Sequence, residues 1–371
     1  MKFITSAENL KRTVSTASHF ISAKTQLPIL GNILISASGS KVSFSATNLE
    51  NAVSLKIPAK VEKEGEITVP GKTFLDIVLN LNNEIEINED KEKIKISSGS
   101  FKSTILGLNA TDFPKIPNTS KKEGFVIKKS ELNTALLNTL FSLSLDETRP
   151  ILTGVLFDFI DGDLYFISTD GFRLSKIKVD TKKTPKDFEK PVVPKNILYE
   201  ILKNESEEDV FISIDEKNGQ FIASIEDCLY SSRIIEGSYP DYQKIIPDKH
   251  KLRVVLDKEE LVKAIKLASV FAREAGNIIK LQVNSHQSKV RIVSENQTTG
   301  SQENEIEAKV ENDEDVKDFE ISYNYKFIED YLKVVKADEV VMEFSEESKA
   351  GKFLDSSSPT FLHLIMPIKN S

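Results

Sequence analysis

The sequence repeats one pattern three times, at intervals of roughly 125 residues. In each copy a short apolar strand leads into a helix that begins at an N-cap type of residue and carries an acid in its first turn. These helices are expected over residues 6–20, 130–143 and 257–273. Because this period far exceeds that of a solenoid unit, the pattern predicts three copies of a whole domain.

A second helix is expected in each copy, over residues 69–78, 193–202 and 322–332. The stretches between the helices alternate apolar and polar residues, as in 41–44, 163–166 and 289–292, which indicates short strands. Two helices and several strands per copy predict an α+β fold with the helices packed on antiparallel sheets. Proline-containing closing segments followed by polar linkers predict domains over 1–120, 125–247 and 251–371.

The composition is acidic, with a net charge of −8, 39% hydrophobic and 29% charged residues. An excess of acid argues against a protein that simply coats DNA, unless the basic residues gather on one surface. The sequence carries no apolar run of the length of a membrane span or a signal peptide, so a cytoplasmic location is expected. The single cysteine, Cys228, excludes an internal disulfide and is expected as a packed thiol in a strand over 221–230.

A run near the middle of the chain, STDGFRL over residues 168–174, stands between two alternating segments. It predicts strand, turn and strand, with Asp170-Gly171 supplying the positive φ of a tight hairpin. Turn chemistry does not explain the bulky Phe172 and Arg173 that follow immediately, and such residues are candidates for contact with another molecule. A plain surface turn is the alternative interpretation.

Five motifs, spread from end to end, carry a family resemblance: LPILGN at 27–32, TVPGK at 68–72, the run at 168–174, YPDY at 239–242 and LIMP at 364–367. With the threefold repeat, the chain resembles bacterial DNA polymerase III beta subunits, the sliding clamps. The resemblance implies a head-to-tail homodimeric ring around duplex DNA that tethers the replicative polymerase and confers processivity. Encirclement holds DNA topologically, so an acidic protein needs only weak, sequence-independent contacts to phosphates.

The resemblance also implies a groove between the second and third domains. There the DNA polymerase III alpha subunit, the clamp loader and repair proteins would insert short linear peptides rich in Gln, Leu and Phe. The matching positions are Arg149, Ile151, Leu152, Thr169, Gly171, Phe172, Arg173, Leu174, Pro240, Lys244, Ile245, Asn324, Phe327, Leu364, Met366, Pro367 and Lys369. An apolar floor bordered by Arg and Lys suits such a peptide, although Leu364 and Met366 could serve only as core. Lysine at 244 and 369, where relatives often have arginine, is expected to shift peptide preference.

Two further surfaces follow from the resemblance. DNA contacts are implied for Arg12, Lys24, Lys263, Lys266 and Arg273, of which those on helices lie opposite the apolar stripe; ordinary solvated side chains are the alternative. The dimer seam is implied at Ser103, Ile105, Val270 and Phe271. For Ile105 and Phe271, a place in the dimer seam and a place in the hydrophobic core are equally consistent with the sequence.

Catalysis has no motif to support it. The four histidines lack ligand spacing, and no HExxH, CxxC or phosphate-loop pattern occurs, so neither a metal nor a cofactor is expected. Asp146, Glu147, Asp170 and Arg173 could be the acid–base set of a hydrolase, yet capping, turn formation and surface ion pairing account for them. An adhesion or scaffold protein built from repeats is the other alternative, and the missing export signal counts against it.

Overall fold

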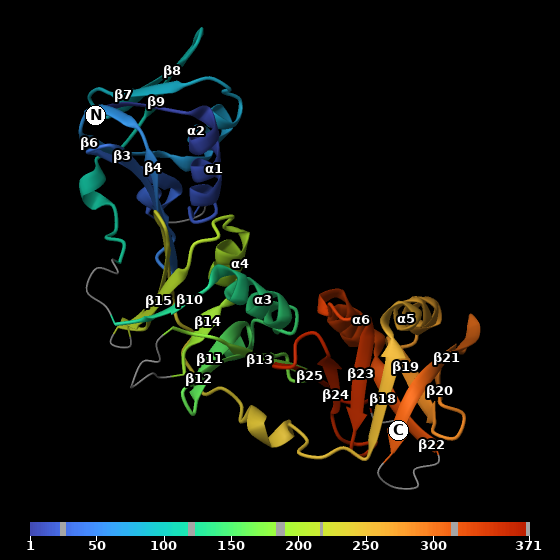
Figure 1. The fold of residues 1–371 in the computed structure, drawn as a ribbon. Coiled ribbons are helices and arrows are strands. Elements are labelled where there is room, and N and C mark those ends of the chain that lie inside the picture. The colour runs from blue at the N-terminus through green and yellow to red at the C-terminus, as the bar shows by residue number, and fades with distance from the viewer. Residues whose placement is uncertain (23–26, 118–122, 183–189, 216–217, 313–317, 369–371) are drawn as a thin grey trace. The chain divides into compact units, whose positions relative to one another are not determined.

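The computed structural model describes residues 1–22, 27–117, 123–182, 190–215, 218–312 and 318–368. The chain forms two compact units (Figure 1). Unit 1 comprises Met1–Leu132, Thr181–Glu189 and Asn196–Ile234, and unit 2 comprises Asn133–Asp180, Lys190–Lys195 and Ile235–Ser371. The middle copy of the repeat therefore contributes to both units.

Each copy of the repeat supplies two helices, as predicted. They are α1 (Ala7–Ser18), α2 (Gly71–Leu79), α3 (Lys129–Leu140), α4 (Lys195–Lys203), α5 (Lys258–Ala272) and α6 (Tyr325–Val334). The expected N-caps hold at Ser6 and Asp257, whose side chains accept the backbone N–H of Asn9 at 3.3 Å and of Glu260 at 2.9 Å. Helix α3 begins one residue before Ser130, so that serine lies inside the helix rather than at its cap.

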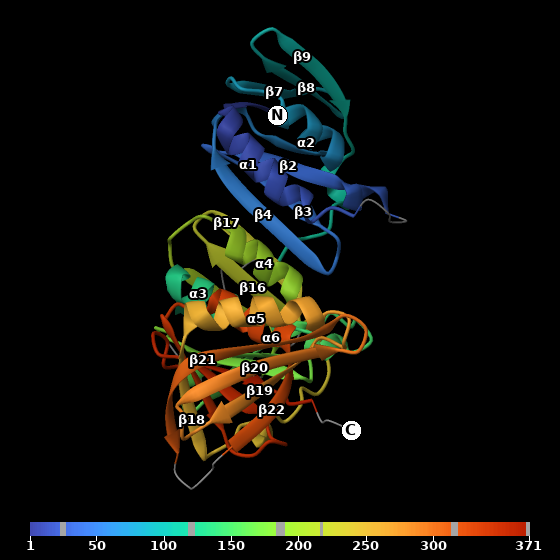
Figure 2. The same cartoon turned by 90° about the vertical axis from the view of Figure 1, so that its right-hand side faces the viewer.

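Unit 1 contains two antiparallel sheets. One has the order β5-β1-β7-β8-β9 and the other β10-β15-β16-β17-β4-β3-β2-β6. The strands are β1 (Lys2–Thr5), β2 (Asn32–Ser38), β3 (Lys41–Thr47), β4 (Asn51–Pro58), β5 (Lys60–Lys63), β6 (Gly65–Pro70), β7 (Ile85–Glu89), β8 (Lys93–Ser98), β9 (Phe101–Leu106), β10 (Phe125–Ile127), β15 (Val210–Asp215), β16 (Gln220–Ile225) and β17 (Cys228–Arg233). Helices α1 and α2 lie side by side (Figures 1 and 2). In the core, Phe44 of β3 packs on Phe3 of β1 and on Phe74 of α2, with ring centroids 6.5 and 6.4 Å apart. These contacts join the two sheets and the helix.

The predicted single strand over 221–230 is wrong. Strands β16 and β17 form a hairpin, and Glu226 takes a positive φ of 48° at its turn. The alternation continues across the turn, so periodicity alone cannot reveal the break. Cys228 is a free, partly buried thiol as expected, and burial raises its pKa, which makes a nucleophilic role unfavourable.

Unit 2 is built on one extended antiparallel sheet with the order β14-β11-β12-β13-β25-β24-β23-β18-β21-β20-β19-β22. The strands are β11 (Gly154–Ile160), β12 (Asp163–Thr169), β13 (Arg173–Val179), β14 (Val192–Pro194), β18 (Leu252–Asp257), β19 (Ile278–Asn284), β20 (Lys289–Asn296), β21 (Gly300–Asn312), β22 (Asp318–Asn324), β23 (Glu339–Phe344), β24 (Gly351–Asp355) and β25 (Phe361–Ile365). Pairing of β13 with β25 joins the second and third copies of the repeat edge to edge. Helices α5 and α6 pack together beside these strands (Figure 2). Among the described residues, no helix has the length and apolar character needed to cross a membrane.

Candidate functional site

The hairpin of β12 and β13 ends in a turn whose backbone is held by side chains. Asp170 Oδ1 accepts the backbone N–H of Phe172 at 2.9 Å and of Arg173 at 3.0 Å. Thr169 Oγ1 donates to the carbonyl of Arg173 at 2.6 Å, and Gly171 takes a φ of 94° that suits glycine. These hydrogen bonds define the backbone of the turn, which leaves the Phe172 side chain 59% exposed at its tip.

Below this turn, the strand pairing brings the predicted floor residues together. Leu174 of β13 lies opposite Leu364 of β25, and both are at most 1% exposed. They share a hydrophobic cluster with Leu156, Ile167, Val192, Tyr242 and Ala350. The partly buried Ile151 and Met366 pack against this cluster. Leu364 is thus core beneath the surface, whereas Met366 keeps part of its side chain accessible.

A hollow of about 590 Å³ opens beside Met366. Its lining consists of Lys244, Ile245, Ile246, Pro247, Asp248, Lys249, Lys251, Ser345, Glu346, Ser348, Lys349, Ala350 and Met366. Lys244 pairs with Asp241 at 2.8 Å and holds the pKa of that carboxyl below its ordinary value. Because the Lys244 side chain is 82% exposed, this ion pair contributes little and can open toward a ligand.

Arg173 is not a free residue on the border of the site, contrary to the sequence-based expectation. Only 10% of its side chain is exposed, and its guanidinium donates to Asp170 at 3.0 Å and to Asp330 at 2.8 Å. The guanidinium carbon also lies 4.7 Å from the ring centroid of Phe327 and 5.6 Å from that of Phe141. Sequence reasoning missed Phe141 and Asp330; the signal for Asp330 is its place three residues after Phe327, on the same helical face.

The other predicted groove residues differ in accessibility. Arg149 and Pro240 are exposed, and Phe327 and Pro367 are partly buried. Leu152 and Thr169 are buried, and Asn324 caps α6 by accepting the Lys326 N–H at 3.1 Å. Ile245 is 42% exposed. Lys369 lies outside the described residues.

A buried histidine, His363 of β25, lies beneath the site. Its Nδ1 is 2.9 Å from Ser175 Oγ, and its ring packs 5.0 Å from Phe141 and 5.3 Å from Tyr331, centroid to centroid. Burial, together with the nearby Arg173 guanidinium, holds the pKa of His363 well below its ordinary value of 6.5. The folded protein therefore keeps this imidazole neutral.

This histidine is expected to destabilise the fold in acid. In the unfolded chain His363 takes up a proton near pH 6.5, whereas in the folded chain it stays neutral to a lower pH. The free energy of unfolding therefore keeps its full value above pH 6.5 and decreases as the pH falls below it. The loss should approach about 1.4 kcal/mol per pH unit in urea unfolding between pH 7.5 and about 5. His363→Gln should flatten this slope relative to His286→Gln, a change at an exposed histidine. Equal slopes in both variants would contradict the assignment.

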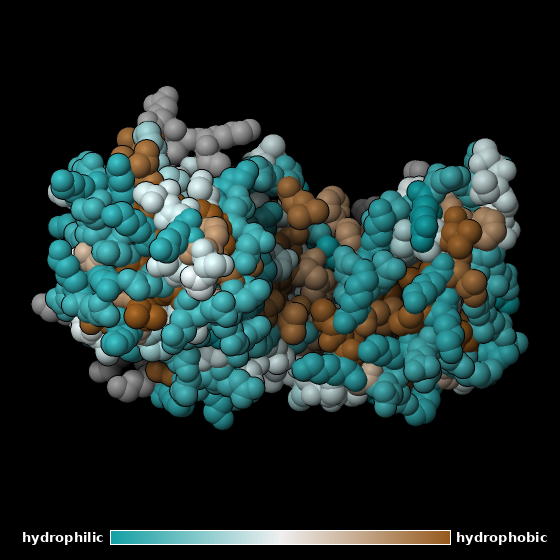
Figure 3. Space-filling model, turned by 90° about the horizontal axis from the view of Figure 1, so that it is seen from above, coloured by the Kyte–Doolittle hydropathy of each residue, from teal (hydrophilic) through white to brown (hydrophobic). Residues whose placement is uncertain are grey.

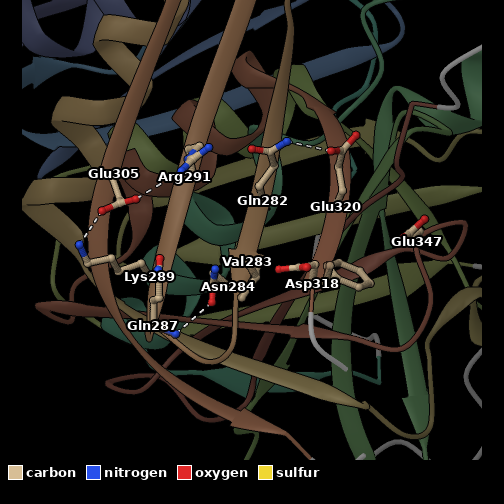
Figure 4. Close-up of a pocket in the computed structure, with 11 residues that line it drawn as sticks. Gln282, Val283, Asn284, Gln287, Lys289, Arg291, Glu305, Asp318, Glu320 and Glu347 are labelled. Carbon is tan, nitrogen blue, oxygen red and sulfur yellow. Dashed lines mark hydrogen bonds and ion pairs between the residues drawn. The ribbon is translucent and has the colours of Figure 1, made fainter. Parts of the chain in front are cut away.

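The carboxylates considered for a hydrolase have structural partners. Asp146 Oδ1 accepts hydrogen bonds from the N–H and the hydroxyl of Thr148, which hold its pKa below the ordinary range and keep it ionised. Asp170 forms the turn described above. A separate hollow of about 270 Å³ on the sheet of β19–β22 is lined mainly by polar side chains (Figure 4). There Glu305 pairs with Lys289 and Arg291, and Gln282 donates to Glu320 at 2.9 Å, so these two carboxylates already have partners within the sheet.

The residues implied for DNA and for the seam lie in both units. Arg12, Lys263, Lys266 and Arg273 are exposed on or next to α1 and α5, and Lys24 lies outside the described residues.

At the predicted dimer seam, the alternation of strand β9 buries Ile105, which is 5% exposed, and turns Leu106 outward at 65%. Val270 of α5 is 63% exposed and Phe271 is partly buried. Apolar side chains also interrupt the polar surface where α5 and α6 face the viewer, on the right of Figure 3. Ile105 is thus core, and Leu106 replaces it as a surface candidate.

Comparison with known proteins covers nearly the whole chain. Models of the N-terminal, central and C-terminal domains of the DNA polymerase III beta subunit match residues 1–117, 126–241 and 243–369. The beta sliding clamps of Staphylococcus epidermidis and Staphylococcus aureus are each 29% identical, over 94% of both chains.

Solved structures agree with this match. The DNA polymerase sliding clamp from Bacillus subtilis is 28% identical, with a TM-score of 0.92 over all of both chains. A sliding clamp from Bartonella birtlesii, solved bound to griselimycin, shares the fold with a TM-score of 0.91 at 24% identity over both full chains. The chain therefore belongs to the DNA polymerase III beta subunit family, and its function is that of a DNA sliding clamp, a non-catalytic processivity factor of DNA replication.

Proposed function

We propose that the surface around the β12–β13 turn is the site where this clamp holds its partners. The observation that carries the proposal is the pairing of Leu174 with Leu364, which places Ile151 and Met366 against one apolar cluster. Phe172 and Ile245 add exposed apolar surface, and Lys244 adds an exposed ammonium. An apolar floor with a polar border suits a short linear peptide with leucine and phenylalanine anchors. The griselimycin complex of the Bartonella clamp supports ligand binding by this fold.

The partners proposed are the DNA polymerase III alpha subunit, the clamp loader and repair proteins. Each would present a peptide rich in Gln, Leu and Phe. Fluorescence polarisation with a labelled peptide of this kind tests the proposal: saturable binding is expected, with the same peptide carrying alanine at its apolar positions as the control. Equal signals from both peptides would contradict the groove assignment.

We further propose that two chains close head to tail into a ring. Strand β9 is the edge of its five-stranded sheet, and it exposes Leu106 at 65% and Leu108, just beyond it, at 46%. An edge strand with exposed leucines favours pairing with another surface. Leu267 and Val270 of α5, in the third copy of the repeat, are exposed at 54% and 63% and lie about one helical turn apart, so they offer a second apolar surface. Contact between unlike ends closes into a ring when the rotation per subunit allows it.

The protein is accordingly expected to sediment as a dimer, and Leu106→Asp should convert it to a monomer. A carboxylate placed in an apolar interface loses hydration without gaining a partner. The control is Leu49→Asp, at a leucine that is 51% exposed with a φ of 75°, a backbone conformation that aspartate accepts more readily. Analytical ultracentrifugation distinguishes the outcomes. A wild-type monomer at all concentrations, or a dimer that Leu106→Asp leaves intact, would contradict the seam.

Contact with duplex DNA is proposed for Arg12, Lys24, Lys263, Lys266 and Arg273. Exposed cations on helices can meet phosphates weakly and without sequence preference. Lys263 pairs with Glu259 at 3.9 Å, which is loose enough for a phosphate to replace the carboxylate.

We also propose three domains, over residues 1–120, 125–247 and 251–371, and a cytoplasmic location. Catalytic, metal or cofactor chemistry has no part in it.

A further inference from the structure

Asp330 lies on α6, three residues after Phe327, and it connects two segments that are 157 positions apart in the sequence. Its Oδ2 accepts a hydrogen bond from Arg173 Nη1 at 2.8 Å. Its Oδ1 pairs with Lys333 at 3.0 Å, a side chain that is 61% exposed. We infer that Asp330 is a positioning residue. By holding Arg173, it sets the relative placement of Phe172 and Phe327 at the partner site. The inference rests on the proposed function for what that site binds.

Arg173 is the link through which Asp330 acts. The guanidinium is nearly buried between the rings of Phe141 and Phe327, where little water remains to hydrate its charge. Two carboxylates supply charge-assisted hydrogen bonds instead, Asp170 from the turn itself and Asp330 from α6. Removing Asp330 leaves Arg173 paired with Asp170 and packed against Phe327, so the fold is retained while the charge-assisted hydrogen bond to α6 is lost.

The consequence concerns Phe172 and Phe327. Phe172 stands at the tip of the turn that Asp170 and Arg173 hold, and Phe327 stands on α6 with its ring against the same guanidinium. These two side chains come from different copies of the repeat. Their relative placement therefore depends on the chain of contacts from α6 through Asp330, Arg173 and Asp170 to the backbone of the turn. A peptide that contacts both would find its site already formed.

Binding of the labelled peptide tests this role. Asp330→Asn keeps the shape of the side chain and removes its charge, and it should weaken binding about tenfold. Asp330→Glu should recover part of the affinity because it restores the carboxylate. Glu329→Gln is the matched control on the same helix, since Glu329 pairs with Lys333 at 3.4 Å while Asp330 takes the hydrogen bond from Arg173, and it should bind as the wild type does. A lower melting temperature in Asp330→Asn with unchanged affinity would reduce Asp330 to a structural role and overturn the inference.

A second measurement needs no peptide. The chain contains no tryptophan, so Phe172→Trp introduces a single indole at the tip of the turn. Adding Asp330→Asn should lower the fluorescence anisotropy of that indole and raise its quenching by acrylamide, whereas adding Glu329→Gln should change neither. Identical signals with and without Asp330→Asn would overturn the inference. If the wild type bound no peptide, the proposed partner site would fail, and the indole signal would still decide whether Asp330 holds the turn.

Discussion

Replacing Ile245 and Met366 together by alanine is expected to weaken peptide binding about a hundredfold. Ile245 is 42% exposed beside the hollow, and Met366 is partly buried against the cluster beneath it. Both side chains can therefore contact a ligand while the strands below keep their packing. Truncating each of these two contacts is expected to cost about 1.4 kcal/mol, a tenfold loss of affinity, and two such losses at separate positions combine to about a hundredfold.

Truncating Leu364 to alanine would not test peptide recognition cleanly, although the sequence predicts Leu364 as a groove residue. At 1% exposure it packs with Leu174 inside the cluster, so shortening it would remove core contacts along with any contact to a ligand. A loss of binding in such a variant would report partly on folding. Ile245 and Met366 separate the two effects because the core remains closed without them.

The control for the double variant is Leu49→Ala with Leu79→Ala, two exposed leucines in unit 1. This pair removes comparable apolar surface far along the chain from the groove residues and should leave the dissociation constant unchanged. Titrations by fluorescence polarisation, with melting curves for each variant, give the comparison. If both double variants bound the peptide like the wild type, the apolar floor would have no role in recognition.

Local chemistry made the elements of each repeat predictable. The caps at Ser6 and Asp257, the paired helices and the hairpin around Asp170-Gly171 all depend on neighbours within a few residues. What the sequence could not show is which strands of different copies pair. The pairing of β13 with β25 comes from backbone edges that carry no residue signal, and it is this pairing that forms the floor of the groove.

Side-chain direction was the other limit. Strand β9 contains the predicted seam residues Ser103 and Ile105, but a shift of one residue decides whether Ile105 or Leu106 faces the core. Arg173 was expected to meet a ligand, and the fold instead encloses it between two rings and two carboxylates. An arginine in sequence shows its charge but not the partners that neutralise it, and Asp330 lies too far along the chain to be linked to it by spacing.

Retention on circular DNA is expected to differ greatly from retention on linear DNA. The chain carries a net charge of −8, so its affinity for phosphates rests on a few exposed cations and should fall steeply with salt. A closed ring around a circle cannot leave without opening, whereas on a linear duplex it slides off the end. Moderate salt, about 0.2 M, should therefore remove the protein from linear DNA and spare the circular complex.

The decisive measurement follows from this difference. The protein is loaded by a clamp loader with ATP onto a nicked circular plasmid, separated from free protein by gel filtration at about 0.2 M salt, and half of the sample is then cut once by a restriction enzyme. We expect the protein to stay with the intact circle and to be released from the cut plasmid. Equal loss from both forms, or equal retention on both, would contradict the claim that this chain holds DNA by encircling it.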